Sequence, residues 1–212
     1  MQIISGTLKG LTLETTKTQK LDKTLRPTTS YSKQVLFNLL HNNKVIGTEI
    51  EGKLILDGFA GTGAVGIEFF SRGASHITFV DSNPENVKQL KLQTAKFGVS
   101  ASIIQAFLPD NKKIKTQFDI IFLDPSYEEG KGKIVQTVKN LLNENLAEDG
   151  LIVLEILNHK KQIEELKKHL EKKEILLNLI YERESSSKTY FLFFKKMAIA
   201  ETIPISEAEK QE

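Results

Sequence analysis

Apolar residues from Lys53 onward form short runs rich in β-branched and aromatic side chains, and these runs alternate with segments of helical spacing. This alternation is typical of a parallel sheet built from strand-helix-strand units, with helices on both faces. The pattern predicts strands at residues 53–57, 76–81, 101–105, 118–124 and 150–156. It predicts helices at Ala64–Arg72, 83–97, 131–146 and 159–172.

The two ends of the chain depart from this alternation. Residues 3–13 contain short β-prone pieces separated by glycines, which predict a small hairpin, and Tyr31–Leu40 has apolar positions at helical spacing. Near the other end, Ile175–Glu182 and Thr189–Phe194 flank a tight serine-rich loop and predict an antiparallel pair at the end of the sheet. We therefore expect an N-terminal hairpin and helix extension at 1–44, one α/β domain at 45–197 and a disordered acidic tail at 198–212.

Composition narrows the class of protein. The chain has 212 residues, 40% of them hydrophobic, which is enough for one sizeable core. It has no cysteine, which excludes disulfides, thiolate metal ligands and cysteine nucleophiles and fits a reducing compartment. No apolar run approaches the roughly 20 residues that cross a bilayer, and the N-terminus lacks an export signal. We expect a cytoplasmic monomer with no membrane association.

The distribution of charge is more informative than its sum. A formal net charge of +2 is common among enzymes of every kind. Residues 1–44, however, hold seven lysines or arginines against two acids, a local charge of +5 that leaves the remainder at −3. A nucleic-acid footprint, if the protein has one, is expected in this segment, although a solvated lysine-rich loop at 16–24 would have the same composition.

The first chemical motif is the sequence from Asp57 to Gly66, in which a buried strand ends in a carboxylate and continues through glycines into a helix. Gly61, Gly63 and Gly66 have the GxGxxG spacing that permits a tight turn and close approach of a ligand to the backbone. That spacing alone is a weak signal. Asp81 strengthens it, because an acid at the end of the next strand can accept hydrogen bonds from both hydroxyls of a ribose. Together these residues predict a nucleoside-containing ligand.

Asp57 helps to distinguish between nucleoside ligands. A pyrophosphate on this turn would be repelled by a nearby carboxylate, whereas the sulfonium and amino groups of S-adenosylmethionine would be attracted. Asp57 therefore favours a methyltransferase over a nicotinamide enzyme. The alternative is that Asp57 only caps local backbone amides.

The second motif is Asp124-Pro125-Ser126-Tyr127, which follows an apolar strand. It resembles the Asp/Asn/Ser-Pro-Pro-Tyr/Phe motif of methyltransferases that act on amino groups of bases, with Ser126 in place of the second proline. An exocyclic amine is a poor nucleophile, so Asp124 and the Pro125 carbonyl would accept its hydrogens and orient its lone pair, and Tyr127 would stack on a flipped-out base. The alternative is a simple proline turn after a buried strand.

A third piece, Leu25-Arg26-Pro27-Thr28-Thr29, precedes the predicted N-terminal helix, and Ile4–Gly10 lies upstream of it. With these segments and the two motifs, the chain resembles the bacterial 16S ribosomal RNA guanine-N2 methyltransferase family over roughly residues 2–195. The resemblance implies a Rossmann-like class I methyltransferase fold with a seven-stranded, mostly parallel sheet, helices on both faces and a small N-terminal extension. It also implies S-adenosylmethionine as cofactor, and ribosomal RNA or the assembling small ribosomal subunit as partner.

The same resemblance assigns expected roles. Arg26 and Thr28 would lie at the substrate mouth, Lys33 stands where the family has arginine, and Tyr31 departs from a second basic residue. Gln105 and Ala106 would contact the adenine edge. The expected catalytic residues are Asp124, Pro125 and Tyr127. The expected cofactor-binding residues are Asp57, Phe59, Ala60, Gly61, Gly63, Asp81, Ser82, Gln105, Ala106 and Asp124. The expected substrate-binding residues are Arg26, Thr28, Lys33, Ser126 and Tyr127.

Three other interpretations remain open from the residues alone. An adenine-N6 methyltransferase shares the amine chemistry, an NAD-linked oxidoreductase shares the GxGxxG spacing, and a non-catalytic RNA-binding module could retain the fold. The four histidines are scattered without ligand spacing, so we expect no metal. The guanine acceptor rests on the family resemblance only.

Overall fold

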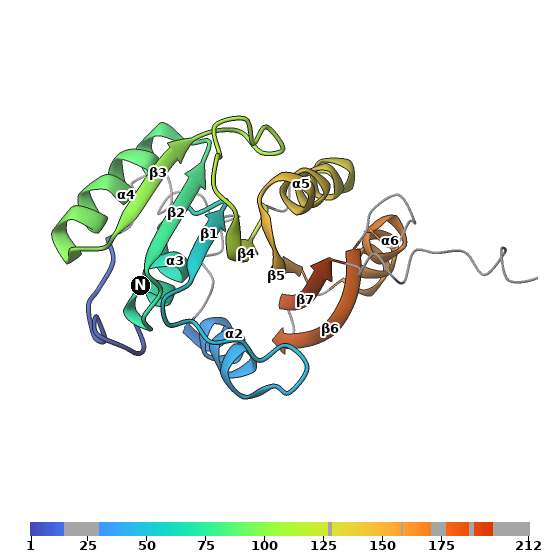
Figure 1. The fold of residues 1–212 in the computed structure, drawn as a ribbon, viewed down its shortest axis with the longest axis horizontal. Helices are drawn as coiled ribbons and strands as arrows, with labels where there is room; N and C mark the ends of the chain where they lie inside the picture. The colour runs from blue at the N-terminus through green and yellow to red at the C-terminus, as the bar shows by residue number, and fades with distance from the viewer. Residues whose placement is uncertain (15–29, 127–128, 158, 171–176, 187–188, 197–212) are drawn as a thin grey trace, which may run out of the picture.

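A seven-stranded sheet forms the centre of the protein (Figure 1). The computed structural model describes residues 1–14, 30–126, 129–157, 159–170, 177–186 and 189–196. The strands are β1 (Leu54–Gly58), β2 (His76–Asp81), β3 (Ala101–Gln105), β4 (Phe118–Leu123), β5 (Leu146–Leu157), β6 (Leu177–Ser186) and β7 (Thr189–Lys196). Their order across the sheet is β3-β2-β1-β4-β5-β7-β6.

The first five strands are parallel to one another, whereas β7 runs antiparallel between β5 and β6. The predicted fold class and the antiparallel pair at the end of the sheet are therefore confirmed. The start of β5 was predicted four residues too late. Phe118 pairs with Leu146, and the register then shifts before Ile120 pairs with Leu151. The exposed Glu148 and Asp149 lie between these two pairs, so the apolar pattern did not extend back to Leu146.

Helices cover both faces of the sheet. They are α2 (Ser30–Asn42), α3 (Ala64–Ser71), α4 (Pro84–Phe97), α5 (Lys131–Glu144) and α6 (Lys160–Leu170). Core residues of α2, α3 and α4 share one apolar cluster with alternate strand positions such as Ile55, and those of α5 and α6 share a second cluster with the intervening positions such as Leu56. This alternation follows from the two-residue period of a strand.

The N-terminal hairpin is confirmed and packs against α3. Gln2 and Thr12 form an antiparallel bridge, and Ile3 lies 1% exposed in the same cluster as α2 and α3. Gly6 has φ of +80°, and a Cβ there would lie 1.7 Å from the Ser71 carbonyl oxygen, so the hairpin meets α3 at a point where only glycine fits. The predicted tail at 198–212 lies outside the described residues.

Candidate active site at the carboxyl edge of the sheet

Strand register brings the predicted acids together. Gly58 at the end of β1 pairs with Val80 of β2 on one side and with Leu123 of β4 on the other. Asp81 and Asp124 are the next residues after these partners, so they flank the turn that leaves β1. This is the position at which open α/β sheets bind ligands, beyond the carboxyl ends of the strands.

The turn itself depends on left-handed backbone conformations. Gly61 and Gly63 have φ of +53° and +74°, which glycine adopts without a Cβ penalty. Phe59 also has a positive φ, +64°, which is a strained conformation for an aromatic residue. Strain of this kind concentrates at ligand-binding sites, where the surrounding structure maintains it. The backbone at 59–63 is thus held in a tight, preformed loop, as the glycine spacing predicted.

Gly66 explains how closely α3 approaches the sheet. A Cβ at this position would lie 2.3 Å from the Phe79 ring and 2.9 Å from the Asp57 carboxylate. The backbone N–H of Gly66 donates a hydrogen bond of 2.9 Å to Asp57 Oδ2, and Asp57 is 2% exposed. Asp57 therefore caps the first turn of α3, which is the backbone-capping role that the sequence left open.

Burial raises the pKa of the Asp57 carboxyl well above its ordinary value. The Gly66 N–H opposes this shift, while the nearby carboxylates of Asp124 and Asp81 add to it. The three acids are therefore close enough to interact electrostatically. A cation placed among them would reverse the balance, because it would favour the ionised forms.

Asp81 is organised by the backbone around it. Its Oδ2 accepts the Gly61 N–H at 2.7 Å, and its Oδ1 accepts the Asn83 N–H at 2.8 Å and the Asn86 side-chain amide at 3.2 Å. A carboxylate has about four acceptor sites, so Asp81 keeps capacity on Oδ2 beside the glycine turn. The side chain is thus fixed at the mouth of the turn.

The end of β3 completes this side of the site. Gln105 pairs with Asp81 in the sheet, and its side-chain amide donates to the Ser82 carbonyl at 3.4 Å. Both Gln105 and Ser82 are exposed, and the Ala106 N–H donates to the Asp81 carbonyl at 3.2 Å. The predicted adenine-edge residues therefore lie next to Asp81 at the same edge.

On the other side of the turn, the Asp124-Pro125-Ser126 loop forms part of a cavity of about 470 Å³. Pro125 and Ser126 line one side, and apolar side chains from α5, the end of β5 and α6 line the others: Ile134, Ile156, Leu157 and Leu166. Lys131, His159 and Lys161 are the described basic residues of the lining, and Glu129 and Glu165 are its described acids. Its size lies within the usual range of small-ligand pockets. The cavity can therefore hold a planar organic group beside the loop that carries Asp124.

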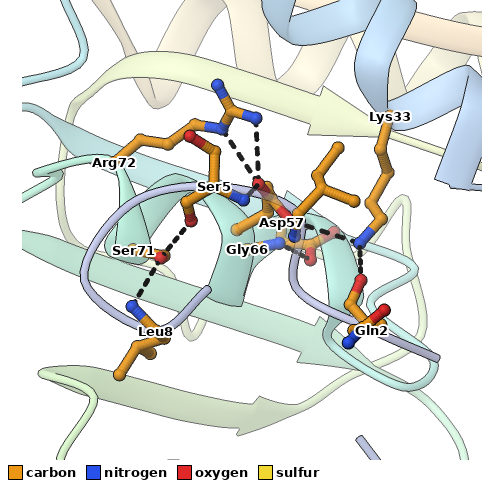
Figure 2. Close-up of polar contacts among 10 residues, drawn as sticks. Gln2, Ser5, Leu8, Lys33, Asp57, Gly66, Ser71 and Arg72 are labelled. Atoms are coloured by element: carbon orange, nitrogen blue, oxygen red, sulfur yellow. Dashed lines mark hydrogen bonds and ion pairs between the residues drawn. The ribbon is translucent and has the colours of Figure 1, made fainter. Parts of the chain in front are cut away.

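Lys33 corrects one expectation. Its side chain is 0% exposed, and its ammonium donates to the Gln2 carbonyl at 2.7 Å and to Glu68 Oε2 at 3.3 Å (Figure 2). Burial lowers the pKa of Lys33, and the adjacent Glu68 carboxylate raises it. Lys33 therefore offers no surface to a substrate, because it is the internal partner of a buried acid. Lys33 lies on the buried face of α2 because of the way this helix packs. A comparison of sequence motifs does not show which face of a helix is buried.

Three predicted site residues, Arg26, Thr28 and Tyr127, lie outside the described residues. Two internal residues were not predicted at all. Glu68 is a lone acid in the otherwise apolar stretch of α3, which is the signal that could have revealed it. Gln93, 2% exposed on α4, carries no such signal, because glutamine is ordinary on a helix surface. Its hydrogen-bond partners, the Glu14 N–H and the Thr62 carbonyl, lie far from it in the sequence.

Among the described residues, no group of three or more His, Asp and Glu side chains is arranged to hold a metal ion. Within the same part of the chain, no helix has both the length and the hydropathy of a membrane span.

Comparison with known proteins identifies relatives over most of the chain. A family described as conserved hypothetical protein 95 matches residues 1–180. "Putative rRNA methyltransferase YlbH" of Bacillus subtilis is 36% identical over 172 residues, which are 77% of this chain and 85% of the relative. "Ribosomal RNA small subunit methyltransferase D" of Buchnera aphidicola is 35% identical over 162 residues, covering 73% of this chain and 75% of the relative.

The solved structure of "Putative methyltransferase yhhF" from Escherichia coli is similar throughout, with a TM-score of 0.73 and 25% identity. The similarity extends over 93% of this chain and 98% of the Escherichia coli chain. These similarities confirm the Rossmann-like class I methyltransferase fold that the sequence predicted.

Proposed function

The chain belongs to the family described as conserved hypothetical protein 95 and is a methyltransferase, and we propose that it transfers a methyl group from S-adenosylmethionine to the exocyclic N2 of a guanine in 16S ribosomal RNA. The small-subunit ribosomal RNA in the name of the Buchnera relative supports this substrate class. The position of the acids around the glycine turn supports the cofactor.

The residues at the turn fit S-adenosylmethionine by their chemistry. Asp57 and Asp81 form no ion pair with any residue that the structure describes, so a bound cation would meet uncompensated negative charge. Asp81 would accept hydrogen bonds from the ribose hydroxyls, and Gln105 and Ala106 would border the adenine. The Gly61–Gly63 backbone would lie against the rest of the cofactor. The cofactor supplies an activated methyl group on a positively charged sulfur. Asp57 would act through its charge, since its carboxylate is buried beneath the turn.

Asp124 and the Pro125 carbonyl are proposed to orient the acceptor. Both belong to the loop that separates the glycine turn from the cavity, and each can accept a hydrogen from an exocyclic amine. Two acceptors would turn the amine lone pair away from its ring conjugation and towards the turn. Ser126 would border the base, and Tyr127 would stack on it. No covalent enzyme intermediate is required, and the chain has no cysteine to form one.

One observation carries the proposal: the glycine turn lies between Asp81 and Asp124, with a cavity of base-accommodating size on the far side of the Asp124 loop. A dinucleotide oxidoreductase would place a pyrophosphate on the same turn. That placement conflicts with the cluster of carboxylates.

The test is nucleoside mass spectrometry of unmethylated 16S ribosomal RNA and of small subunits after incubation with the protein and S-adenosylmethionine. We expect N2-methylguanosine at one position. N6-methyladenosine in its place would favour an adenine-N6 methyltransferase. Calorimetry with S-adenosylmethionine and NAD in parallel checks the cofactor. Tight NAD binding without S-adenosylmethionine binding would contradict the proposal. Loss of the same nucleoside from ribosomal RNA of cells lacking the gene would assign this modification to the protein in cells, and fractionation of those cells would test its expected cytoplasmic location.

A further inference from the structure

One acid in the lining of the cavity has an unsatisfied oxygen. Glu129 Oε2 is buried, and it accepts no hydrogen bond from any residue that the structure describes. Its ion-pair partner, Lys133 Nζ, lies 3.6 Å away, which is too far for a hydrogen bond. The Glu129 side chain is 15% exposed, so water reaches little of it. A buried oxygen without a donor is costly, and a donor on a bound ligand would remove that cost.

The local backbone keeps Glu129 beside the Asp124-Pro125-Ser126 loop. The Glu129 N–H donates to the Ser126 carbonyl at 3.0 Å, which closes a turn between this loop and α5. Acids in front of a helix often cap its first N–H groups. Here Gly130 is the N-cap of α5, and Glu129 Oε2 accepts none of those N–H groups. Glu129 instead lines the cavity together with Pro125 and Ser126.

The ion pair with Lys133 does not account for the burial of Glu129. The Lys133 side chain is 53% exposed, and its ammonium also lies 4.6 Å from the centroid of the Phe107 ring. An exposed pair between residues four apart on a helix contributes little to stability. The carboxylate therefore keeps acceptor capacity that no contact among the described residues uses.

The proposed reaction supplies a donor of the right kind. Guanine carries its N2 amine and an N–H at N1 side by side on its Watson–Crick edge. Asp124 and the Pro125 carbonyl are proposed to accept the two amine hydrogens, so the N1–H still requires an acceptor. An ionised carboxylate only accepts hydrogen bonds, and Glu129 follows the same loop. Adenine has no hydrogen at N1, so its N1 lone pair would face the carboxylate unfavourably.

We propose that Glu129 is a specificity-determining residue, which selects guanine by accepting the N1–H of the base that is methylated at N2. The inference rests on the proposed function, because that function puts the acceptor guanine in the cavity beside Asp124. Apolar lining residues such as Ile134 and Ile156 would cover the faces of the base, while Glu129 contacts its edge. A site of this kind rejects an analogue without the donor, since the acceptor is then left buried and unpaired.

The experiment replaces the target guanine by 2-aminopurine, which keeps the 2-amino group and has no hydrogen at N1. Ribosomal RNA fragments carry either base at the nucleotide that nucleoside mass spectrometry identifies, and kcat/KM is measured for each. The wild-type protein should favour guanine about 100-fold or more. Glu129→Gln should lower the guanine value and raise the 2-aminopurine value, because the amide can donate to the bare N1. The ratio should therefore fall at least about tenfold.

Two further variants make the result specific. Glu148→Gln makes the same chemical change at an exposed acid near the start of β5 and should keep the wild-type ratio. Glu129→Ala removes the acceptor altogether, so its ratio should also fall. A merely structural role would lower both kcat/KM values equally and leave the ratio unchanged. 2-Aminopurine also lacks the O6 oxygen of guanine, and comparison of the ratio between wild type and variant removes that contribution.

The outcomes distinguish this inference from the proposed function. A wild-type ratio retained in both Glu129 variants overturns the inference, and equal kcat/KM values for the two bases in the wild-type protein do the same. Both results leave guanine N2 methylation intact. If the wild-type protein does not methylate the guanine fragment at N2, the proposed function fails and the inference fails with it.

Discussion

Two buried carboxylates, one on each side of the start of α3, have opposite surroundings. Glu68 is 0% exposed and has two cations, Lys33 and Arg72, together with two backbone N–H groups. Asp57 is 2% exposed and has the Gly66 N–H, with the carboxylates of Asp81 and Asp124 as its charged neighbours. The two residues are only eleven positions apart in the sequence, and Glu68 belongs to α3, whereas Asp57 belongs to β1. Burial alone therefore does not assign a role.

The difference lies in compensation of charge. A buried carboxylate such as Glu68 has its charge paired and its oxygens hydrogen-bonded within the protein. Its removal therefore leaves buried partners without an anion and destabilises the fold. Asp57 has one N–H partner, a raised pKa and further acids as charged neighbours, so it leaves a requirement for positive charge that a ligand can meet. The comparison predicts a structural role for Glu68 and a functional role for the acids at the carboxyl edge, and four substitutions can break or sharpen it.

The largest effect on stability is expected for Glu68→Leu. It leaves the Lys33 ammonium buried without its anion, and removal of one partner of a buried pair costs about 3–5 kcal/mol. Urea unfolding followed by circular dichroism measures the loss. Lys53→Met removes the partly exposed pair with Asp119 and should cost at most about 1 kcal/mol. Equal losses in the two variants would contradict the distinction between compensated and exposed pairs.

The largest effect on catalysis is expected for Asp124→Ala. Loss of an acceptor that orients the amine should lower kcat at least about 100-fold, while cofactor affinity changes little. Methyl transfer to unmethylated 16S ribosomal RNA and calorimetry with S-adenosylmethionine give the two quantities. Turnover near the wild-type rate would remove Asp124 from the mechanism.

Asp81→Ala should act on the cofactor instead. It removes the proposed ribose acceptor and also frees the Gly61 N–H that Asp81 holds, so the dissociation constant of S-adenosylmethionine should rise about tenfold or more, equivalent to about 1.4 kcal/mol. Asp110→Ala, an exposed acid in the loop after β3, is the matched control and should bind normally. A normal affinity in the Asp81 variant would separate this acid from the site.

The smallest and most diagnostic effect is expected for Asp57→Asn. The folded-state pKa of Asp57 is raised, so the native state retains a proton that the unfolded chain has lost. Stability therefore falls as the pH rises from the ordinary carboxyl pKa to the raised one, and the full cost is present above the raised pKa. Asparagine removes this cost and keeps an acceptor for Gly66, so the variant should gain about 0.5–2 kcal/mol near neutral pH and almost nothing at low pH.

The same variant tests charge at the site. Binding of positively charged S-adenosylmethionine should weaken relative to neutral S-adenosylhomocysteine, and the wild-type preference for the cation should increase as the pH rises through the raised pKa. Unfolding curves at several pH values and parallel calorimetry provide both measurements. If Asp57→Asn gains no stability near neutral pH relative to low pH, a free-energy cost from burial of the Asp57 carboxylate is contradicted.

Local patterns predicted most of the fold because they repeat along the chain. Strand and helix periods placed every element of the sheet from β1 to β7. Errors arose at ends such as Leu146, where a change of register leaves the exposed Glu148 and Asp149 between two apolar pairs. The glycine turn was predictable for the same reason, since its conformations depend on residues adjacent in sequence. The positive φ of Phe59 was not, because an aromatic side chain ordinarily avoids that region.

By itself, the sequence determined the parallel α/β sheet, the order of its elements and the appearance of Asp57, Asp81 and Asp124 at strand ends. Those features follow from residue spacing and from the rule that parallel strands end at a common edge. Only the tertiary structure decided that Lys33 faces inward to Glu68, that Asp57 lies beneath the turn and that Gln93 joins Glu14 to Thr62. These contacts join residues that are distant in sequence, and the free energy of a charge or an amide depends on its surroundings after folding.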